Sequence, residues 1–498
     1  MKRAWSVLLV FLVLVLALGF GAGNLKFAIE TEPVGLDPHL ITAFASHRIL
    51  ENVYDGLLMY DAEMNLVPAL AESFEIVDPN TVVFTLRSNV TFHDGSPLTM
   101  EDVLYSFERI RDPNMGSPAA SYYTEVSSIR DLGDNRLEFK LNVPMVAPLL
   151  HNLAGVNSSI VSKEFVESGA NMQLQTNGTG PFQIAEYVAG DHITLQKCAN
   201  FYEQGIPKLD SITFVIIPEE IGRVSALRNG DVHLAKISEP VSLNMLSANA
   251  FTIYRQPVLS YYLLGLNDQA GALADPRVRR AISMAIDREA LIKMVAFGEA
   301  AVTGVMNPTV EAWAVPPSAF PEFSYNPQKA KELLEEAGYG DGFSFSITAA
   351  ARYNFDKVAQ VIQAQLAQVG IQANLDMVEW GIFIQKWRDI DFDSFVSMNG
   401  GSVDPDKQLY RTFHSEGSTN KFHFSNARVD ELLEAGRLET NLQKQYEIYA
   451  ELQYLLVEES PFIFLYSPNN LFASTLRVSG FSPMPNESLT ELRVTEIQ

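Results

Sequence analysis

Three aspartates at alternating positions, Asp389, Asp391 and Asp393, form the pattern in this sequence that comes nearest to a metal-binding loop. A calcium loop places oxygen ligands at its first, third and fifth positions, glycine at the sixth and a bidentate glutamate at the twelfth. Here the sixth position is a serine and the twelfth a glycine, so the calcium pattern fails. Because Ile390 and Phe392 alternate with the acids, the segment is predicted to be a strand with one charged face.

The sequence also lacks a recognisable catalytic motif. The eight histidines include no pair at i, i+4, and the nine-residue gap between His414 and His423 carries no metal-ligand signature. The sequence contains no G-x-S-x-G, H-E-x-x-H or G-x-x-x-x-G-K-[ST] motif. Sixty acidic residues still offer many carboxylate pairs, and only their separation in space would identify a glycosidase. We therefore predict no enzyme, cofactor or metal site, and keep a secreted hydrolase as the alternative class.

The amino-acid composition excludes further classes of protein. With 47% hydrophobic residues the 498-residue chain can bury enough apolar surface to fold, and its length suggests about three structural units. A formal charge of −24 argues against nucleic acid, because phosphate binding relies on Lys and Arg. One cysteine, Cys198, cannot form an internal disulfide and is interpreted as an inert, buried thiol.

The amino terminus has the layout of a secretory signal. Lys2 and Arg3 precede an apolar run over residues 7–20, and the small residues 21–23 follow it. We predict a cleavable signal peptide at residues 1–23 and an extracytoplasmic or periplasmic location. A retained membrane anchor is the alternative.

Hydrophobic periodicity alternates between strand and helix signals, which indicates an α/β protein. Asp275-Pro276 and Asn326-Pro327 each place an N-cap before a proline at the first helical position. The clearest predicted strands are 25–30, 82–86, 136–141, 193–196, 211–216 and 343–347, and predicted helices begin at 276 and 327 and cover 357–369 and 441–459.

The segment from Phe92 to Ser106 carries a specific resemblance. FHDGSPLT at 92–99, followed by Asp102-Val103 and Ser106, resembles the F-x-D-G-x-P-[LF]-[TN]-A-x-D-V-x-x-S signature of bacterial extracellular solute-binding proteins of the peptide and nickel class, family 5. Further matches follow in the same order at 36–38, 54–57, 68–73, 178–182, Asn200, Tyr202, Asn267, 275–282, 287–288 and 325–327. The signature turn at Asp94-Gly95 and the cap at Asp275 are interpreted as folding determinants.

The resemblance implies an α/β, two-lobed periplasmic-binding-protein fold (class II, cluster C-like) with an extra inserted domain. It also implies a monomer that captures a small solute by hinge closure and delivers it to the membrane permease subunits of an ABC importer. The predicted domains are a discontinuous domain I (24–50, 185–266 and 474–498), an inserted domain II (51–184) and domain III as the second lobe (267–473).

The same resemblance supplies candidate ligand residues. Arg352 resembles the arginine that holds a peptide carboxylate, whereas Gly401 falls where the acid for the peptide amine is expected and Met398 replaces the usual tryptophan. Without that acid, a desolvated ammonium would lack a counter-charge. The predicted ligand-binding residues are Glu32, Arg352, Tyr353, Asn354, Trp380, Met398, Asn399, Gly401 and Asp404.

The class of solute stays open between two alternatives. A peptide or modified peptide is ranked first, and an oligosaccharide follows closely because Trp380 could stack on a sugar ring. Nickel is disfavoured because no histidine cluster is present, although a nickel chelate would need few protein ligands.

Overall fold

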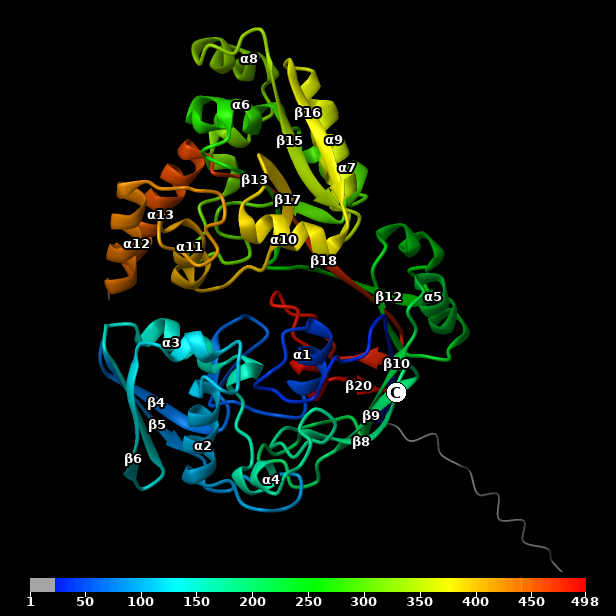
Figure 1. The fold of residues 1–498 in the computed structure, drawn as a ribbon. Coiled ribbons are helices and arrows are strands. Elements are labelled where there is room, and N and C mark those ends of the chain that lie inside the picture. The colour runs from blue at the N-terminus through cyan, green and yellow to red at the C-terminus, as the bar shows by residue number, and fades with distance from the viewer. Residues whose placement is uncertain (1–22, 440) are drawn as a thin grey trace, which may run out of the picture.

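The computed structural model describes residues 23–439 and 441–498, and it has two lobes joined by strand β18 (Phe462–Thr475). Figure 1 shows β18 passing from the upper lobe, which contains residues 261–466, into the lower lobe, which contains residues 24–257 and 469–498. Of the predicted signal peptide, residues 1–23, residues 1–22 lie outside the described part of the chain. Among the helices that the structure describes, none has the length and apolar character needed to cross a membrane.

The upper lobe is a five-stranded sheet covered by helices. Its strand order is β16-β15-β17-β13-β18, with β15 parallel to both of its neighbours and β13 antiparallel to β17 and β18. The strands are β13 (Tyr261–Leu266), β15 (Phe343–Ala350), β16 (Ile371–Val378) and β17 (Ser394–Asn399), and the short β14 (Ala300–Val302) pairs with β18. The helices are α6 (Pro276–Ala285), α7 (Arg288–Val295), α8 (Pro327–Glu336), α9 (Phe355–Ala367), α10 (Trp380–Asp389), α11 (Pro405–Phe413), α12 (Ala427–Leu438) and α13 (Leu442–Glu459).

The lower lobe continues the same sheet on the other half of β18. The order is β18-β11-β1-β10-β9-β8, in which β1 is parallel to β10 and β11, and β12 pairs with the opposite edge of β18. The elements are β1 (Asn24–Ile29), α1 (Phe44–Leu50), α4 (Lys163–Glu167), β8 (Phe182–Val188), β9 (His192–Lys197), β10 (Ser211–Ile216), α5 (Glu220–Asn229), β11 (Leu234–Ile237), β12 (Phe251–Pro257), β19 (Val478–Ser479) and β20 (Glu496–Ile497).

The lower lobe also contains a separate antiparallel sheet, with the order β4-β5-β7-β6 and its own apolar core. Figure 1 places it below α12 and α13 of the upper lobe. Its elements, with the neighbouring hairpin and helices, are β2 (Leu58–Tyr60), β3 (Leu66–Pro68), β4 (Ala71–Asp78), β5 (Thr81–Leu86), α2 (Met100–Arg111), β6 (Val126–Gly133), β7 (Arg136–Leu141) and α3 (Val146–Leu153). The exact domain bounds stay a prediction.

Local sequence signals position these elements as expected. The Asp275 carboxylate accepts a hydrogen bond from the Arg277 backbone N–H at 2.8 Å, and α6 starts there. Gly95 has φ +89°, a conformation that glycine adopts without steric cost, so the predicted turn of the signature is present. Thr99 and Asp102 form a capping box at the start of α2, which gives this part of the signature a structural role.

Two sequence interpretations are wrong. Residues 389–393 do not form a strand, because α10 continues to Asp389 and Ile390 ends it in the left-handed region at φ +57°. The alternation of acidic and apolar residues therefore reflects a helix end followed by a loop that leads into β17. Cys198 is half-buried instead of buried.

The described chain passes between the lobes twice, at residues 258–260 and at residues 467–468 of β18. Asn307, which is 1% exposed, ties the two crossings together. Its side-chain Nδ2 donates to the Val258 carbonyl oxygen at 2.7 Å and to the Ser467 hydroxyl at 2.8 Å. The Val258 backbone N–H donates in turn to the Pro468 carbonyl oxygen at 3.2 Å. The crossings thus form one hydrogen-bonded unit.

Replacing Asn307 by alanine should destabilise the protein by about 1–3 kcal/mol, because buried acceptors at both crossings would lose their donor. Urea unfolding followed by circular dichroism measures this change. Asn114→Ala is the matched control, since Asn114 is partly exposed in a surface turn and bonds only to nearby Asp112. Equal unfolding midpoints for the two variants would contradict the role assigned to Asn307.

Candidate functional site

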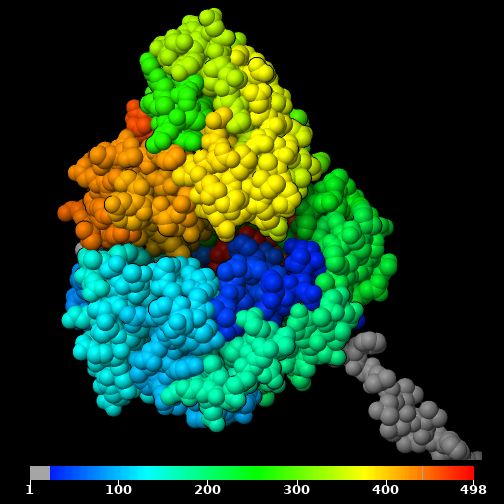
Figure 2. Space-filling view, viewed as in Figure 1, coloured from blue at the N-terminus to red at the C-terminus, as the bar shows by residue number. Residues whose placement is uncertain are grey.

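The candidate residues of the upper lobe follow the carboxyl ends of its parallel strands. Arg352, Trp380 and Gly401 each come two residues after β15, β16 and β17 respectively. Ligands of open α/β sheets bind in the crevice beyond the carboxyl ends of such strands. Figure 2 shows a hollow between the two lobes, with residues of the amino-terminal segment and of the carboxyl-terminal tail at its base.

Arg352 lies on an aromatic cluster at one side of this crevice. Its guanidinium carbon is 4.9 Å from the Trp380 ring centre and 5.0 Å from the Tyr353 ring centre. Tyr353 and Asn354 both have positive φ, and the Tyr262 hydroxyl donates to the Tyr353 carbonyl oxygen at 2.7 Å, which fixes this turn. Arg352 is exposed and makes no ion pair within the part of the chain that the structure describes, so its charge is available to an anion.

The end of β17 forms a second part of the wall. Met398 and Asn399 are half-buried opposite Tyr262 and Tyr261 of β13, and the Asn399 side-chain nitrogen donates to the Tyr261 hydroxyl at 3.4 Å. Burial, and to a smaller extent Tyr353 and Glu487, raises the pKa of Tyr262 to about 12.

Gly401 has a steric reason to lack a side chain. A Cβ atom there would lie 2.0 Å from the carbonyl oxygen of Leu259 and 2.9 Å from the Leu259 Cβ. Leu259 belongs to the first crossing between the lobes, so the crossing segment itself occupies the space of a side chain. An acid at this position would require the backbone to move.

Asp404 does not replace that missing acid as a free carboxylate. It is the N-cap of α11, and its Oδ1 accepts from the Asp406 backbone N–H at 3.0 Å. Its Oδ2 is buried with no hydrogen-bond partner among the described residues, and burial raises the pKa of Asp404 to about 6. Its negative charge also contributes to raising the pKa of Tyr60 in the lower lobe, after the larger effect of burial.

Glu32 lies apart from the other candidates. Its carboxylate accepts from the Gly190 backbone N–H at 2.9 Å and from the Tyr187 hydroxyl at 3.1 Å, which ties the loop after β1 to the β8–β9 turn. The structure therefore brings together Arg352, Tyr353 and Trp380, keeps Met398, Asn399 and Gly401 along the end of β17, and assigns Glu32 other partners. Among the described side chains, no group of three or more His, Cys, Asp or Glu is placed to hold a metal ion.

Sequence reasoning missed a cavity of about 170 Å³ in the lower lobe. Its lining comes from α1, from the chain between α1 and β2, from residues 154–156 and from the carboxyl-terminal segment 486–493. Leu259, which lies against Gly401, donates its backbone N–H to the Pro485 carbonyl oxygen at 2.9 Å, so the carboxyl-terminal side of the cavity lies next to the end of β17.

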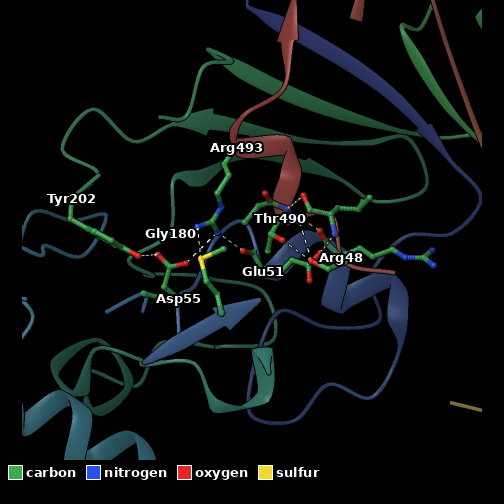
Figure 3. Close-up of polar contacts among 12 residues, drawn as sticks. Arg48, Glu51, Asp55, Gly180, Tyr202, Thr490 and Arg493 are labelled. Carbon is green, nitrogen blue, oxygen red and sulfur yellow. Dashed lines mark hydrogen bonds and ion pairs between the residues drawn. The ribbon is translucent and has the colours of Figure 1, made fainter. Parts of the chain in front are cut away.

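Charged side chains of this cavity form two ion pairs. Arg48 contacts Glu487 at 2.6 Å, and Arg493 contacts Asp55 at 3.3 Å. Figure 3 shows Asp55 between Arg493 and Tyr202, whose hydroxyl donates to the Asp55 carboxylate at 2.9 Å. Each arginine of the cavity thus already has a carboxylate.

Glu51 is the acid of this cavity without an ion pair among the described residues. Its carboxylate accepts a hydrogen bond from the Leu489 backbone N–H, which joins α1 to the carboxyl-terminal segment. Burial raises the pKa of Glu51 to about 7, although the Leu489 N–H and the more distant Arg48 and Arg493 act in the opposite direction. No local pattern in the sequence identifies Glu51, because its partner Leu489 is 438 residues away.

The two-lobed α/β fold with ligand candidates in an interlobe crevice defines a solute-binding protein. The family model of bacterial extracellular solute-binding proteins, family 5, matches residues 65–420, and the chain therefore belongs to this family. The predicted family and fold class are confirmed.

Individual relatives agree with this assignment. The oligopeptide-binding protein AppA of Bacillus subtilis is 27% identical over 94% of this chain and 90% of its own length. The structure of AgaA from A. tumefaciens R10 in complex with agropinic acid is 28% identical, has a TM-score of 0.80 and covers 96% of this chain and 99% of that one. DppA of Helicobacter pylori, an ABC transporter-associated periplasmic binding protein in complex with the peptide STSA, is 26% identical with a TM-score of 0.80 over 95% and 98% of the two chains.

Glu51→Gln should stabilise the unliganded protein more at pH 8 than at pH 4.5. The folded-state pKa of Glu51, about 7, lies above its ordinary value of 4.5, so the native state loses stability as pH rises between these values. Glutamine keeps the acceptor for Leu489 and removes the titration, and the gain at pH 8 should be about 1 kcal/mol or more. Thermal unfolding at the two pH values measures it, with the exposed Glu164→Gln as control. If the difference in melting temperature between wild type and Glu51→Gln is the same at both pH values, the pKa of Glu51 is not raised.

Proposed function

We propose that this chain is the extracytoplasmic substrate-binding subunit of an ABC importer and that it encloses a peptide or peptide-like solute between its lobes. The observation that carries the proposal is Arg352, an exposed guanidinium held against Trp380 and Tyr353 at the carboxyl ends of the upper-lobe strands. A guanidinium has the fork geometry that binds a carboxylate through two parallel hydrogen bonds.

The wider role follows from the family and from the relatives. Family members are extracellular solute-binding proteins, and the DppA relative is described as ABC transporter-associated and periplasmic. We infer that residues 1–23 direct export, that the mature protein acts as a monomer in the periplasm or extracytoplasmic space, and that its partners are the permease subunits of the importer. The predicted domain bounds and ligand-binding residues are part of this proposal.

A peptide is favoured over an oligosaccharide by the surroundings of Trp380. Its ring stacks on Phe383 at 5.5 Å with an interplanar angle of 11°, and Arg352 also lies over it. These two contacts leave less of the ring for a sugar, whereas Arg352 remains available for the terminal carboxylate of a peptide. AppA and DppA are peptide binders by name or by bound ligand, which agrees with this preference.

The two short segments that connect the lobes could act as a hinge between them. A small change of backbone dihedral angles at residues 258–260 and 467–468 would rotate one lobe against the other while both sheets stay intact. The solute would stabilise the closed arrangement by contacting both walls of the crevice, to the extent that it binds that arrangement more tightly.

Arg352→Gln should weaken binding of peptides with a free terminal carboxylate by about 10–100-fold, because a hydrogen-bonded charge pair would be lost. Binding of the corresponding peptide amides should change much less. Isothermal titration calorimetry with a panel of tripeptides and their amides measures both. Arg388→Gln is the matched control, since Arg388 is exposed near the end of α10. If the affinities for the peptide acids and the peptide amides fall equally, Arg352 does not recognise the carboxylate.

A bound peptide should reduce the radius of gyration in small-angle X-ray scattering, because the lobes close on it. The wild-type protein should contract on addition of a tripeptide that it binds, and Arg352→Gln should not contract at the same concentration. Tight binding without contraction would refute hinge closure. Conversion of the peptide, detected by mass spectrometry in the same samples, would favour the secreted hydrolase instead.

A further inference from the structure

The cavity of the lower lobe contains one more negative charge than its ion pairs account for. Arg48 pairs with Glu487 and Arg493 pairs with Asp55, whereas Glu51 has no cationic partner within the described residues. His47 also lines the cavity, and burial lowers its pKa, so it is neutral at neutral pH and supplies no counter-charge. The cavity therefore offers a single uncompensated carboxylate.

We propose that Glu51 binds the amino group of the solute and replaces, from the lower lobe, the acid that position 401 of the upper lobe lacks. This inference rests on the proposed peptide-binding function and adds a residue and a ligand group to it. It predicts that the solute has a free amine as well as a carboxylate.

The position of the cavity supports this assignment. The Leu259 backbone N–H donates to the Pro485 carbonyl oxygen at 2.9 Å, and residues 486–488, which follow Pro485, line the cavity. The cavity therefore lies beside the stretch of the upper lobe that Leu259 contacts at the end of β17. Gly401 is on that stretch. A solute that places its amine near Gly401 would therefore find the acid in the lower lobe instead of at position 401.

The chemistry of the cavity also suits an ammonium group. The Glu51 carboxylate accepts from the Leu489 N–H, has the Ser488 hydroxyl as a second donor, and keeps further lone pairs for an ammonium. An ammonium has three N–H donors and no acceptor, so it complements a carboxylate that is short of donors. The volume of about 170 Å³ admits such a group, with part of the adjoining chain. An ammonium held there would also lower the raised pKa of Glu51 by favouring its charged form.

Glu51 also has a structural contact, and the test must separate this contact from ligand binding. Glutamine at position 51 keeps a carbonyl oxygen for the Leu489 N–H, so the carboxyl-terminal segment stays attached while the charge is lost. Aspartate keeps the charge on a shorter side chain. The matched control is Glu164→Gln, the same chemical change at an exposed position of α4.

Each purified protein is incubated with a mixture of tripeptides that have free amines and the same tripeptides after N-acetylation. The peptides that each protein retains are then quantified by mass spectrometry. Wild type and Glu164→Gln should retain the free-amine peptides at least about 10-fold over the acetylated ones, as expected for one buried charge pair. Glu51→Gln should bring this ratio close to one while still retaining acetylated peptides at the wild-type level. Glu51→Asp should keep part of the preference.

Each other outcome has a defined meaning. An unchanged ratio in Glu51→Gln, or a wild-type preference for acetylated peptides, overturns the role of Glu51 and leaves peptide binding intact. Retention of neither set by the wild type overturns the proposed peptide function and this inference with it. Loss of acetylated peptides in Glu51→Gln, together with a lower melting temperature at pH 4.5, would make the contribution of Glu51 structural and would also overturn the proposal.

Discussion

The single strand β18 belongs to the sheets of both lobes, and this shared backbone limits how the two lobes can move. Its first half pairs with β13 and its second half with β11 and β12, so neither lobe can separate from it without losing a ladder of hydrogen bonds. The two halves meet at residues 467–468, which pair with β14, and Pro468 has no N–H to contribute to a ladder. Asn307 joins this point to the first crossing, at residues 258–260, by hydrogen bonds to Ser467 and Val258.

The same crossing determines part of the chemistry of the crevice. Leu259 occupies the space next to Gly401, and for this reason the upper-lobe wall has an arginine but no free acid where the peptide-binding pattern would place one. The negative charge lies instead on the other wall, in the cavity between α1 and the carboxyl-terminal segment. The proposed transfer of amine recognition from the upper to the lower wall would thus have its cause in how closely residues 258–260 pass the end of β17.

Sequence alone predicted the features that depend on neighbouring residues. The caps at Asp275 and Asn326, the turn at Gly95 and the strand Ser211–Ile216 follow from local geometry, and the structure has all of them. The interpretation of residues 389–393 as a strand was wrong because five alternating residues cannot distinguish a strand from a helix end. The proximity of Arg352 to Trp380 was accessible only through family resemblance. The role of Glu51 could not be predicted from the sequence, since its hydrogen-bond partner Leu489 is more than 400 positions away.

The carboxyl-terminal segment 486–493 completes the cavity, so the lower wall of the crevice depends on residues that lie far apart along the chain. Until residues 486–493 are available, Arg48 lacks Glu487, Asp55 lacks Arg493 and Glu51 lacks the Leu489 N–H, so the lower half of the crevice is unfinished. The buried core residues of the upper lobe, by contrast, all lie within residues 259–466. The lower wall of the crevice can therefore form only when segments more than 400 positions apart come together, a requirement that the core of the upper lobe does not have.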